Sequence, residues 1–347
     1  KRKQRLTFYH RLSRSDSQAQ EYTSGASYLV YSMVKRLGRI GVVGPGAIGG
    51  FYGGMLAQSG EDVHFLFRST FDDIVRDGLT LVRQSEQGRS STVGNLHAYH
   101  TPSSLGPCDW IIVAVKATAN SALEEIISPM LGPSTRLLTL QNGMGNVENL
   151  HRLFGEDRQV MAGLCFTCIN RTSPSVIESL LPGYVQFGQL DGQLSKDAET
   201  MVQSFEASGI KVRRADSLDD ALWRKLCWNI PFNGLAIAAG GITTDLILAD
   251  SKLKKRAHDL MLEVQSAAYA HGVEIEDSFL NRQFELTEPM GPYRPSSLID
   301  FLGGKPVEVD AIWGEPLRRG IARNVLMPET EKLWNELIEA TGVVKKT

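Results

Sequence analysis

The sequence has few cysteines and no long apolar run. Four cysteines among 347 residues do not suggest a disulfide framework, so we expect a reducing, cytoplasmic environment. The longest runs without a charged residue, 40–60 and 226–244, are interrupted by glycine, proline or polar residues. Because a bilayer requires a nearly continuous apolar stretch of about twenty residues, the sequence predicts no membrane span.

A basic surface is missing from most of the chain as well. The formal net charge is −2, but residues 1–38 hold eight Lys or Arg against two Asp or Glu. The rest of the chain has 29 basic and 37 acidic residues, a net charge of −8. Proteins that bind nucleic acids carry a basic patch, so an acidic body argues against that class of partner.

A metal site is not indicated either. The seven histidines are scattered, and none has the H-x-x-x-H spacing of a helical metal site. Cys165 and Cys168 form a C-x-x-C pair, but a structural zinc site needs four ligands and the chain has no second pair. We interpret the two cysteines as small apolar residues of a strand, and we expect no metal.

Residues 1–38 carry no functional prediction. They are basic, rich in serine and without clear periodicity, and the chain begins with Lys1 rather than methionine. Met33 stands just before the first strong strand pattern. We expect a disordered or non-native extension, with Met33 as the start of translation; an organellar transit peptide is the alternative.

The remaining chain shows two successive patterns. From residue 39 to 215, short apolar strand patterns alternate with helical ones, which predicts an α/β domain with a parallel sheet covered on both faces. From residue 216 to 347 the pattern is mostly helical, which predicts a second, all-helical domain. Within the first domain we interpret "SPSVIESLLPG" as a loop at a strand edge.

The strand pattern "RIGVVG" leads directly into a glycine-rich turn. The spacing G-x-G-x-x-G follows a predicted strand and opens a predicted helix, which is the context that the dinucleotide-binding fingerprint requires. The first glycine permits the tight turn, the second lets the backbone approach a pyrophosphate, and the third lets the helix pack on the strand. We therefore expect a dinucleotide to bind the turn formed by Gly44, Pro45, Gly46, Ala47, Ile48 and Gly49.

The end of the second strand pattern, "DVHFLFRST", distinguishes between two dinucleotides. NAD-binding units usually place Asp or Glu there to bind the ribose 2′-hydroxyl, whereas this chain has Arg68 followed by two hydroxyl residues. A guanidinium suits a 2′-phosphate because it donates two parallel hydrogen bonds. This favours NADP (NADPH) as the cofactor; the alternative is an exposed Arg68 without a ligand.

Two further polar residues end apolar strand patterns. Lys116 follows "DWIIVAV", and Asn142 follows "RLLTLQ". Since doubly wound sheets bind ligands at the carboxyl ends of their strands, we expect Lys116 near the ribose or phosphates and Asn142 near the nicotinamide. The alternative is a solvated lysine and a turn-forming asparagine.

The stretch "WRKLCWNIPFNG" places three polar residues at intervals of four in an apolar, helical run. Lys225, Asn229 and Asn233 share one helix face because four residues turn slightly more than a full circle. A ketone that accepts hydride develops negative charge on oxygen, which an ammonium can stabilise and protonate. The amides could bind the substrate's oxygens, although Pro231 is expected to kink the helix between them. The alternative is a snorkelling lysine with two amides bonded to backbone.

These segments together resemble the ketopantoate reductase family (2-dehydropantoate 2-reductase). The resemblance covers about residues 39–337 and is carried by "IGVVGPGAIGGFYG", "VAVKA", "LQNGMGN", "WRKLCWNIPFN" and "PSSLIDFLGGKPVEVDAIWGEPLRRG". It implies a Rossmann-type domain followed by a helical domain like the C-terminal one of 6-phosphogluconate dehydrogenase. It also implies NADPH-dependent reduction of 2-dehydropantoate to (R)-pantoate, a step toward pantothenate and coenzyme A.

The resemblance implies a role for several residues. Lys225 matches the family's general acid, Asn229, Asn233 and Ser296 match substrate-binding positions, and Glu308 matches a glutamate near both cofactor and lysine. Glu308 could hold the lysine charged and aimed; the alternative is a surface carboxylate. A further polar family position falls near Thr243 here, which leaves open another branched 2-oxo acid as substrate. A non-enzymatic NADP(H) sensor is the second alternative, and a homodimer is left open.

Overall fold

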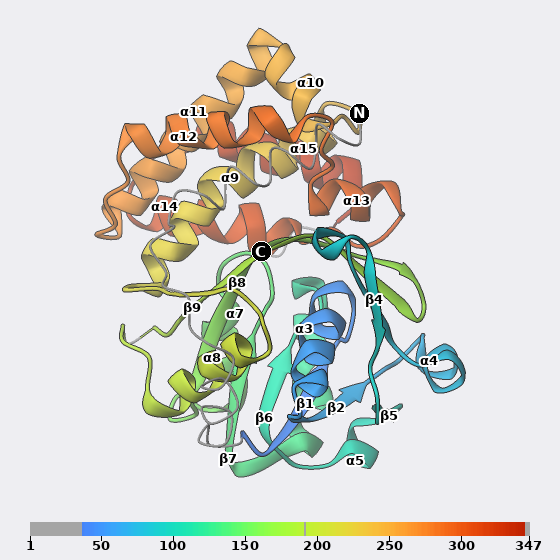
Figure 1. Cartoon of the computed structure of the whole chain (residues 1–347). Helices are drawn as coiled ribbons and strands as arrows, with labels where there is room; N and C mark the ends of the chain where they lie inside the picture. Colours follow the sequence, from blue (N-terminus) through green and yellow to red (C-terminus); the bar gives the residue numbers. More distant parts are fainter. Residues whose placement is uncertain (1–36, 191, 344–347) are drawn as a thin grey trace, which may run out of the picture.

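The computed structural model describes residues 37–190 and 192–343, and these form two parts of different kind. Figure 1 shows a sheet with its helices in the lower half and a group of helices above it. The extension predicted for the N-terminus falls on residues 1–36, which lie outside the described residues.

Ten strands make one sheet in the first part of the described chain. They are β1 (Arg39–Val43), β2 (Asp62–Leu66), β3 (Thr80–Arg83), β4 (Arg89–Thr92), β5 (His97–Tyr99), β6 (Cys108–Val113), β7 (Leu131–Thr139), β8 (Val160–Ser173), β9 (Val176–Gly188) and β10 (Val212–Arg214). Six neighbours, in the order β5-β2-β1-β6-β7-β8, are all parallel. β9 is antiparallel to β8; β3 and β10 pair with β9, and β4 pairs with β3.

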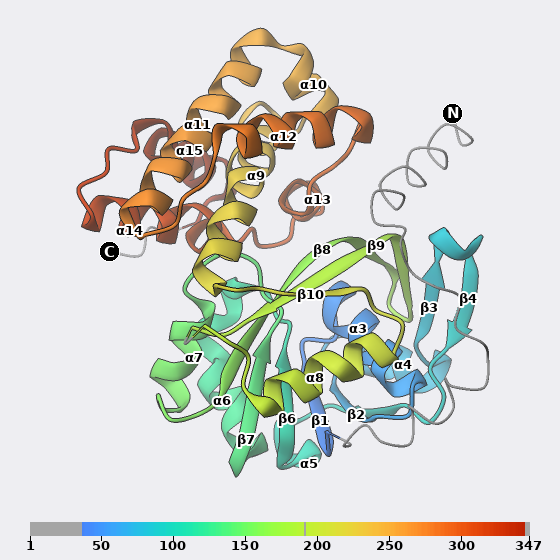
Figure 2. The ribbon, with the colours of Figure 1, turned by 60° about the vertical axis from the view of Figure 1, so that its left-hand side comes forward.

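Helices cover both faces of this sheet (Figure 2). One face carries α3 (Ala47–Gln58), α4 (Phe71–Asp77) and α8 (Lys196–Ala207); the other carries α5 (Pro102–Leu105), α6 (Leu123–Ile127) and α7 (Asn146–Phe154). Alternate residues of a strand supply the two cores: Trp110 of β6 packs with the first set of helices and Ile111 with the second. The predicted parallel sheet, covered on both faces, is confirmed.

The strand order creates a crevice beside β1. β1 pairs with β2 on one edge and with β6 on the other, so the connections leave it in opposite directions. In doubly wound sheets this switch point is where ligands bind, at the carboxyl ends of the strands. The glycine turn, which follows β1, lies at this point.

The interpretation of "SPSVIESLLPG" as a loop holds only for Pro174 and Ser175, the turn between β8 and β9, and is wrong from Val176 onward. Val176 begins β9, and its first residues pair with β3 on one edge and β8 on the other. Ile177 is fully buried in the core against α3. The serines, prolines and glycine suggested a loop, but pairing on both edges satisfies the backbone. The register of β8 with β9 shifts at three places, and one of them is at Pro182 and Gly183, where Gly183 has φ of +53°.

Helices make up the second part of the described chain. They are α9 (Leu218–Ala238), α10 (Thr244–Ala249), α11 (Ser251–Ala270), α12 (Asp277–Thr287), α13 (Ser296–Leu302), α14 (Glu315–Ala322) and α15 (Pro328–Thr341), with a π-helical turn at Asp310–Gly314. α9 lies at the centre, against α11, α13 and α15. It continues as one helix through Pro231, and the kink expected there stays a prediction. No described helix combines the length and apolar character that a membrane span needs.

The passage from sheet to helices is abrupt. β10 ends at Arg214, and α9 begins at Leu218 with the Ser217 hydroxyl accepting a hydrogen bond from the backbone nitrogen of Asp220 (3.3 Å). This serine cap satisfies a free N–H group at the helix start. An α/β part followed by a helical part confirms the predicted fold class, while the domain limits 39–215 and 216–347 stay predictions.

Candidate active site

The glycine turn joins β1 to α3. Gly44 has φ of +79°, and a Cβ there would lie 2.6 Å from the backbone nitrogen of Val115. A Cβ on Gly49 would lie 2.7 Å from that of Ala114. At Gly46, by contrast, the nearest atom to a Cβ would be the Gly44 oxygen, 3.9 Å away. The protein therefore needs two of the glycines for its own packing and leaves open space above the third, as close approach of a phosphate requires.

An arginine without a local sequence motif lies beside this turn. Arg171, on β8, donates hydrogen bonds to the backbone oxygens of Pro45 and Pro174. It forms no ion pair with any described carboxylate, and burial lowers the pKa of its guanidinium. The first turn of α3 contains no acidic residue either. The turn is therefore flanked by one positive side chain and the positive end of a helix dipole.

Arg68 lies just after β2, at the same edge of the sheet. Its side chain is exposed and makes no hydrogen bond or ion pair with a described residue. An unpaired guanidinium at this position could receive a 2′-phosphate, and it would also be stable in water. The structure therefore agrees with both alternatives for Arg68.

Lys116 and Glu308 join the sheet to the helical part. Lys116 Nζ lies 2.5 Å from Asp300 Oδ2 and 3.6 Å from Glu308 Oε2. Glu308 is buried, and its Oε1 accepts a hydrogen bond from the backbone nitrogen of Ala117 (2.8 Å). Burial lowers the pKa of Lys116, but the two carboxylates outweigh it and raise the pKa. Glu308 is therefore not a surface carboxylate.

Burial also acts on Glu308 itself. It raises the pKa of the carboxyl group, while Lys116 and the N–H of Ala117 pull the pKa back down. The ionised form consequently depends on these two partners. Asp300, which sequence reasoning did not single out, adds a second acid to the pair and raises the pKa of Glu308 further.

Lys225 projects from α9 toward the turn after β7. Its Nζ donates to Asn142 Oδ1 (2.9 Å) and lies 5.3 Å from the centre of the Phe166 ring. Burial lowers the pKa of Lys225, and the charge of Glu308 opposes this only in part. The contact predicted between Glu308 and Lys225 is not the one formed: Glu308 bonds to Lys116, and a neutral amide orients Lys225. The reason is that Glu308 lies at the end of the loop that meets β6 rather than β7.

The other polar positions on this face of α9 differ in their surroundings. Asn229 is partly buried and makes no side-chain hydrogen bond with a described residue. Asn233 is buried, and its Oδ1 accepts from the backbone nitrogen of Ser297 at the start of α13 (3.0 Å). Ser296 is exposed there. The Thr243 hydroxyl donates to Asp245. Asn233 thus brings Ser296 to the same side of α9 and keeps only its NH₂ group for a ligand.

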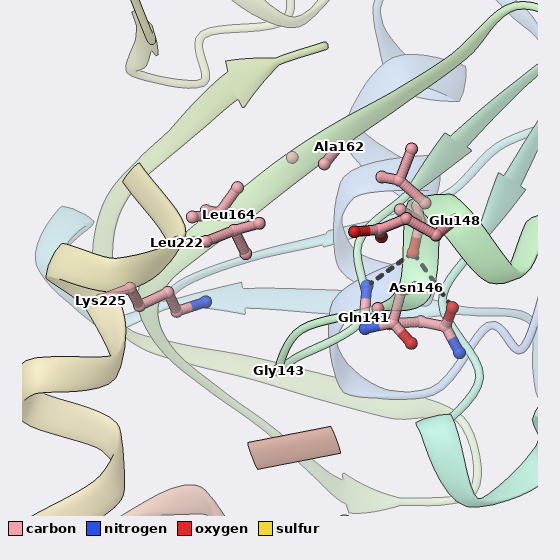
Figure 3. A pocket seen from close by; sticks show the side chains of 12 residues that line it. Gln141, Gly143, Asn146, Glu148, Ala162, Leu164, Leu222 and Lys225 are labelled. Carbon is pink, nitrogen blue, oxygen red and sulfur yellow. Dashed lines mark hydrogen bonds between the residues drawn. The ribbon is translucent and has the colours of Figure 1, made fainter. Parts of the chain in front are cut away.

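A pocket of about 360 Å³, open to solvent, borders Lys225. Figure 3 shows Lys225 and Leu222 of α9 on one side, and Gln141, Asn146 and Glu148 on the other, beyond the turn that carries Gly143. The lysine amine points into this space. Lys225 is therefore both hydrogen-bonded to the sheet part and reachable from a cavity.

The described residues give no sign of a metal site. Among them, no group of three or more His, Cys, Asp and Glu side chains is arranged to hold a metal ion. Cys165 and Cys168 both lie on β8, as the strand interpretation predicted, and the cysteines are free.

A Rossmann-type sheet with an open glycine turn, faced by a partly buried lysine from a helical part, defines a two-domain oxidoreductase. The model of the family "Ketopantoate reductase PanE/ApbA" matches residues 40–192, and that of its C-terminal region matches residues 217–340. The chain belongs to the ketopantoate reductase family.

Similar proteins agree with this assignment. A 2-dehydropantoate 2-reductase of Nostoc sp. is 33% identical over 301 residues, which cover 85% of this chain and 93% of that protein. The crystal structure of 2-dehydropantoate 2-reductase from Geobacter metallireducens has a TM-score of 0.83 and 38% identity, covering 87% of this chain and 100% of that one. D-mandelate dehydrogenase, in a ternary structure with NADH and anilino(oxo)acetate, shares the fold at 21% identity, with a TM-score of 0.79 over 88% of this chain and 98% of that one.

Proposed function

We propose that this protein reduces 2-dehydropantoate to (R)-pantoate with NADPH, a step of pantothenate and coenzyme A biosynthesis. The observation that carries the proposal is Lys225, a partly buried ammonium that reaches from the helical part to Asn142 at the carboxyl edge of the sheet. This is where a Rossmann-type sheet brings a nicotinamide to its substrate. The similarity to named 2-dehydropantoate 2-reductases supports the choice of substrate.

The residues around the crevice fit NADPH. The glycine turn from Gly44 to Gly49 would receive the pyrophosphate, because space above Gly46 is open and the start of α3 is positive. Arg171 adds charge there, and Arg68 would bind the 2′-phosphate. Lys116, Asn142 and Glu308 would contact the nicotinamide half. NADPH, when bound, supplies the hydride that adds to the ketone carbon.

The side chains of α9 and α13 would carry out the rest of the reaction. Asn229, the NH₂ group of Asn233 and the hydroxyl of Ser296 would bind the carboxylate and hydroxyl oxygens of the substrate. Lys225 would donate a proton to the ketone oxygen as the carbon–oxygen double bond becomes a single bond. Each turnover thus consumes one hydride and one proton, and Lys225 regains its proton from solvent.

Steady-state kinetics with 2-dehydropantoate and NADPH test the proposal directly. The second candidate function is reduction of a different branched 2-oxo acid, and the fold shared with D-mandelate dehydrogenase is the reason to test it. Turnover rates on a panel of branched 2-oxo acids would identify such a substrate. If the protein binds NADPH but no 2-oxo acid causes its oxidation, the non-enzymatic NADP(H) sensor is the function that remains. The homodimer likewise stays a prediction, for which light scattering is the measurement.

Replacing Arg68 with alanine is expected to erode the preference for NADPH over NADH. The ratio of the two kcat/KM values should fall by about 10–100-fold, because a charge-assisted pair with phosphate contributes about 1.5–3 kcal/mol. Arg76→Ala, an exposed arginine on α4, is the matched control. A cofactor ratio equal to that of the wild type would remove Arg68 from the 2′-phosphate site.

The rate is expected to fall at alkaline pH. A proton donor must be charged to act, so kcat decreases as pH rises through the pKa of Lys225 in the complex. Since burial lowers that pKa, the midpoint should lie below the value of about 10.4 for a free lysine. The measurement is the pH dependence of kcat at saturating substrate; a rate that is flat up to pH 10.4 or beyond contradicts the assignment.

A further inference from the structure

A chain of hydrogen bonds between amide side chains ends at the partner of Lys225. Gln141 Nε2 donates to Asn120 Oδ1 (2.8 Å), and Asn120 Nδ2 donates to Asn146 Oδ1 (3.2 Å). Asn146 Nδ2 then donates to the backbone oxygen of Asn142 (3.0 Å). The side-chain oxygen of Asn142 accepts from Lys225 (2.9 Å). Three amides on three separate segments thus lead to the lysine.

Every side-chain amide in this series of hydrogen bonds is oriented in the same sense. Thr139 starts it, because its hydroxyl accepts from the backbone nitrogen of Gln141 (3.2 Å) and donates to Gln141 Oε1 (3.1 Å). Each following amide accepts with its oxygen and donates with its NH₂ group. Turning one amide over would bring two donors or two acceptors together, so the order of the chain determines each orientation.

The turn that carries Asn142 is also held from the helical part. In the π-helical turn, the backbone N–H of Glu315 donates to the backbone oxygen of Asp310, five residues back, instead of to that of Ala311. The free oxygen of Ala311 accepts from the backbone nitrogen of Met144 (2.8 Å). Gly143 permits this contact, since a Cβ there would lie 2.4 Å from the same oxygen. The turn is therefore attached on one side to Ala311 and on the other to Asn146.

We propose that Asn146 and Asn120 are positioning residues of the active site, which hold the Asn142 turn so that Asn142 Oδ1 stays directed at the Lys225 ammonium. The inference rests on the proposed function, in which Lys225 is the proton donor. Asn146 is buried and acts through the Asn142 backbone; Asn120 acts through Asn146 and through Gln141, which precedes Asn142. A neutral amide orients the ammonium without the Coulomb attraction of a carboxylate, so the proton stays available for transfer.

The pocket beside Lys225 indicates what would change if these hydrogen bonds between amides were lost. Gln141 and Asn146 line the same pocket as Lys225 (Figure 3). If the turn loosened, the ammonium would lose its acceptor in a largely buried setting. Glu308, the charged group that also acts on Lys225, would be unchanged. The expected effect is therefore on the orientation and acidity of Lys225 and not on the glycine turn.

Kinetics of Asn146→Ala provide the first test. We expect kcat to fall about 10–100-fold, as misplacement of a catalytic group does, and the KM of NADPH to change less, because the glycine turn lies outside these hydrogen bonds. Asn120→Ala should show the same pattern with a smaller fall. Asn335→Ala, on the exposed face of α15, is the matched control and should leave both constants unchanged. Thermal unfolding shows whether each variant is folded; should Asn146→Ala not fold, Asn120→Ala carries the test.

A titration of Lys225 provides the second test and needs no substrate. The ε-carbon of Lys225 is followed by NMR against pH in the unliganded protein, with Lys225→Ala to assign the signal. Loss of the Asn142 acceptor disfavours the charged form, so the pKa should be lower in Asn146→Ala than in the wild type. A lower pKa together with a lower kcat supports the proposal. An unchanged pKa in a folded variant overturns it, whatever kcat does. Failure of the proposed function is recognised separately, because then the wild type reduces no 2-oxo acid.

Discussion

Replacing Lys225 with alanine is expected to lower kcat with 2-dehydropantoate by about 10²–10⁴-fold, the contribution of a positioned general acid. The ketone oxygen would then develop charge with neither an ammonium to stabilise it nor a proton to neutralise it. The dissociation constant of NADPH should be nearly unchanged, because Lys225 contacts Asn142 and Phe166 and not the glycine turn. Steady-state rates and a fluorescence titration of NADPH measure the two quantities.

Two further variants separate chemistry from packing. Lys225→Met keeps the length of the stem and removes only the charge, so it should be as inactive as Lys225→Ala. Lys252→Ala, an exposed lysine on α11, should have the kcat of the wild type. Activity of Lys225→Ala equal to that of the wild type would exclude this lysine as the proton donor.

Replacing Gly46 with valine is expected to weaken NADPH binding by about 10–100-fold. No protein atom lies closer than 3.9 Å to the Cβ position of Gly46, so the new side chain itself meets only the bound pyrophosphate. The backbone of Gly46, with φ of −74° and ψ of −144°, lies outside the regions that L-residues prefer, so thermal unfolding of the unliganded variant must first show that it is folded. Overfilling a closely packed space costs about 1–3 kcal/mol, which gives the expected change in affinity.

The neighbouring glycines make this test specific. Gly94→Val, at a position with no atom within 4 Å, should change neither stability nor NADPH affinity. Gly49→Val should lower the thermal stability of the unliganded protein, since its Cβ would lie 2.7 Å from Ala114. Normal NADPH affinity in a folded Gly46→Val would show that the pyrophosphate does not bind at this turn.

Local sequence signals predicted much of the fold and some of the candidate site. The glycine turn was recognisable because the spacing of its three glycines, directly after a strand pattern and at the start of a helix pattern, is a signal within one short stretch of sequence. The alternation of strands and helices, and the change to helices near residue 216, depend on side-chain periodicity along the chain itself. The shared face of Lys225, Asn229 and Asn233 follows from helix geometry alone.

Contacts between distant segments were not predictable in the same way. Val176–Gly188 is a strand because β3 and β8 pair with its two edges, and no local pattern shows that. Arg171 reaches Pro45 from 126 residues away. The sequence suggested that Glu308 would orient Lys225, but which carboxylate meets which lysine depends on where the loop before the π-helical turn meets the sheet.

The amino-acid sequence by itself determined the family, the two kinds of structure and the turn at which a dinucleotide is expected, because these depend on residue type and spacing over short distances. Only the tertiary structure decided the partners: Asn142 for Lys225, Lys116 for Glu308, and Ser297 for Asn233. Hydrogen bonds form over about 3 Å, and that proximity between remote residues exists only after the sheet and helices have packed together.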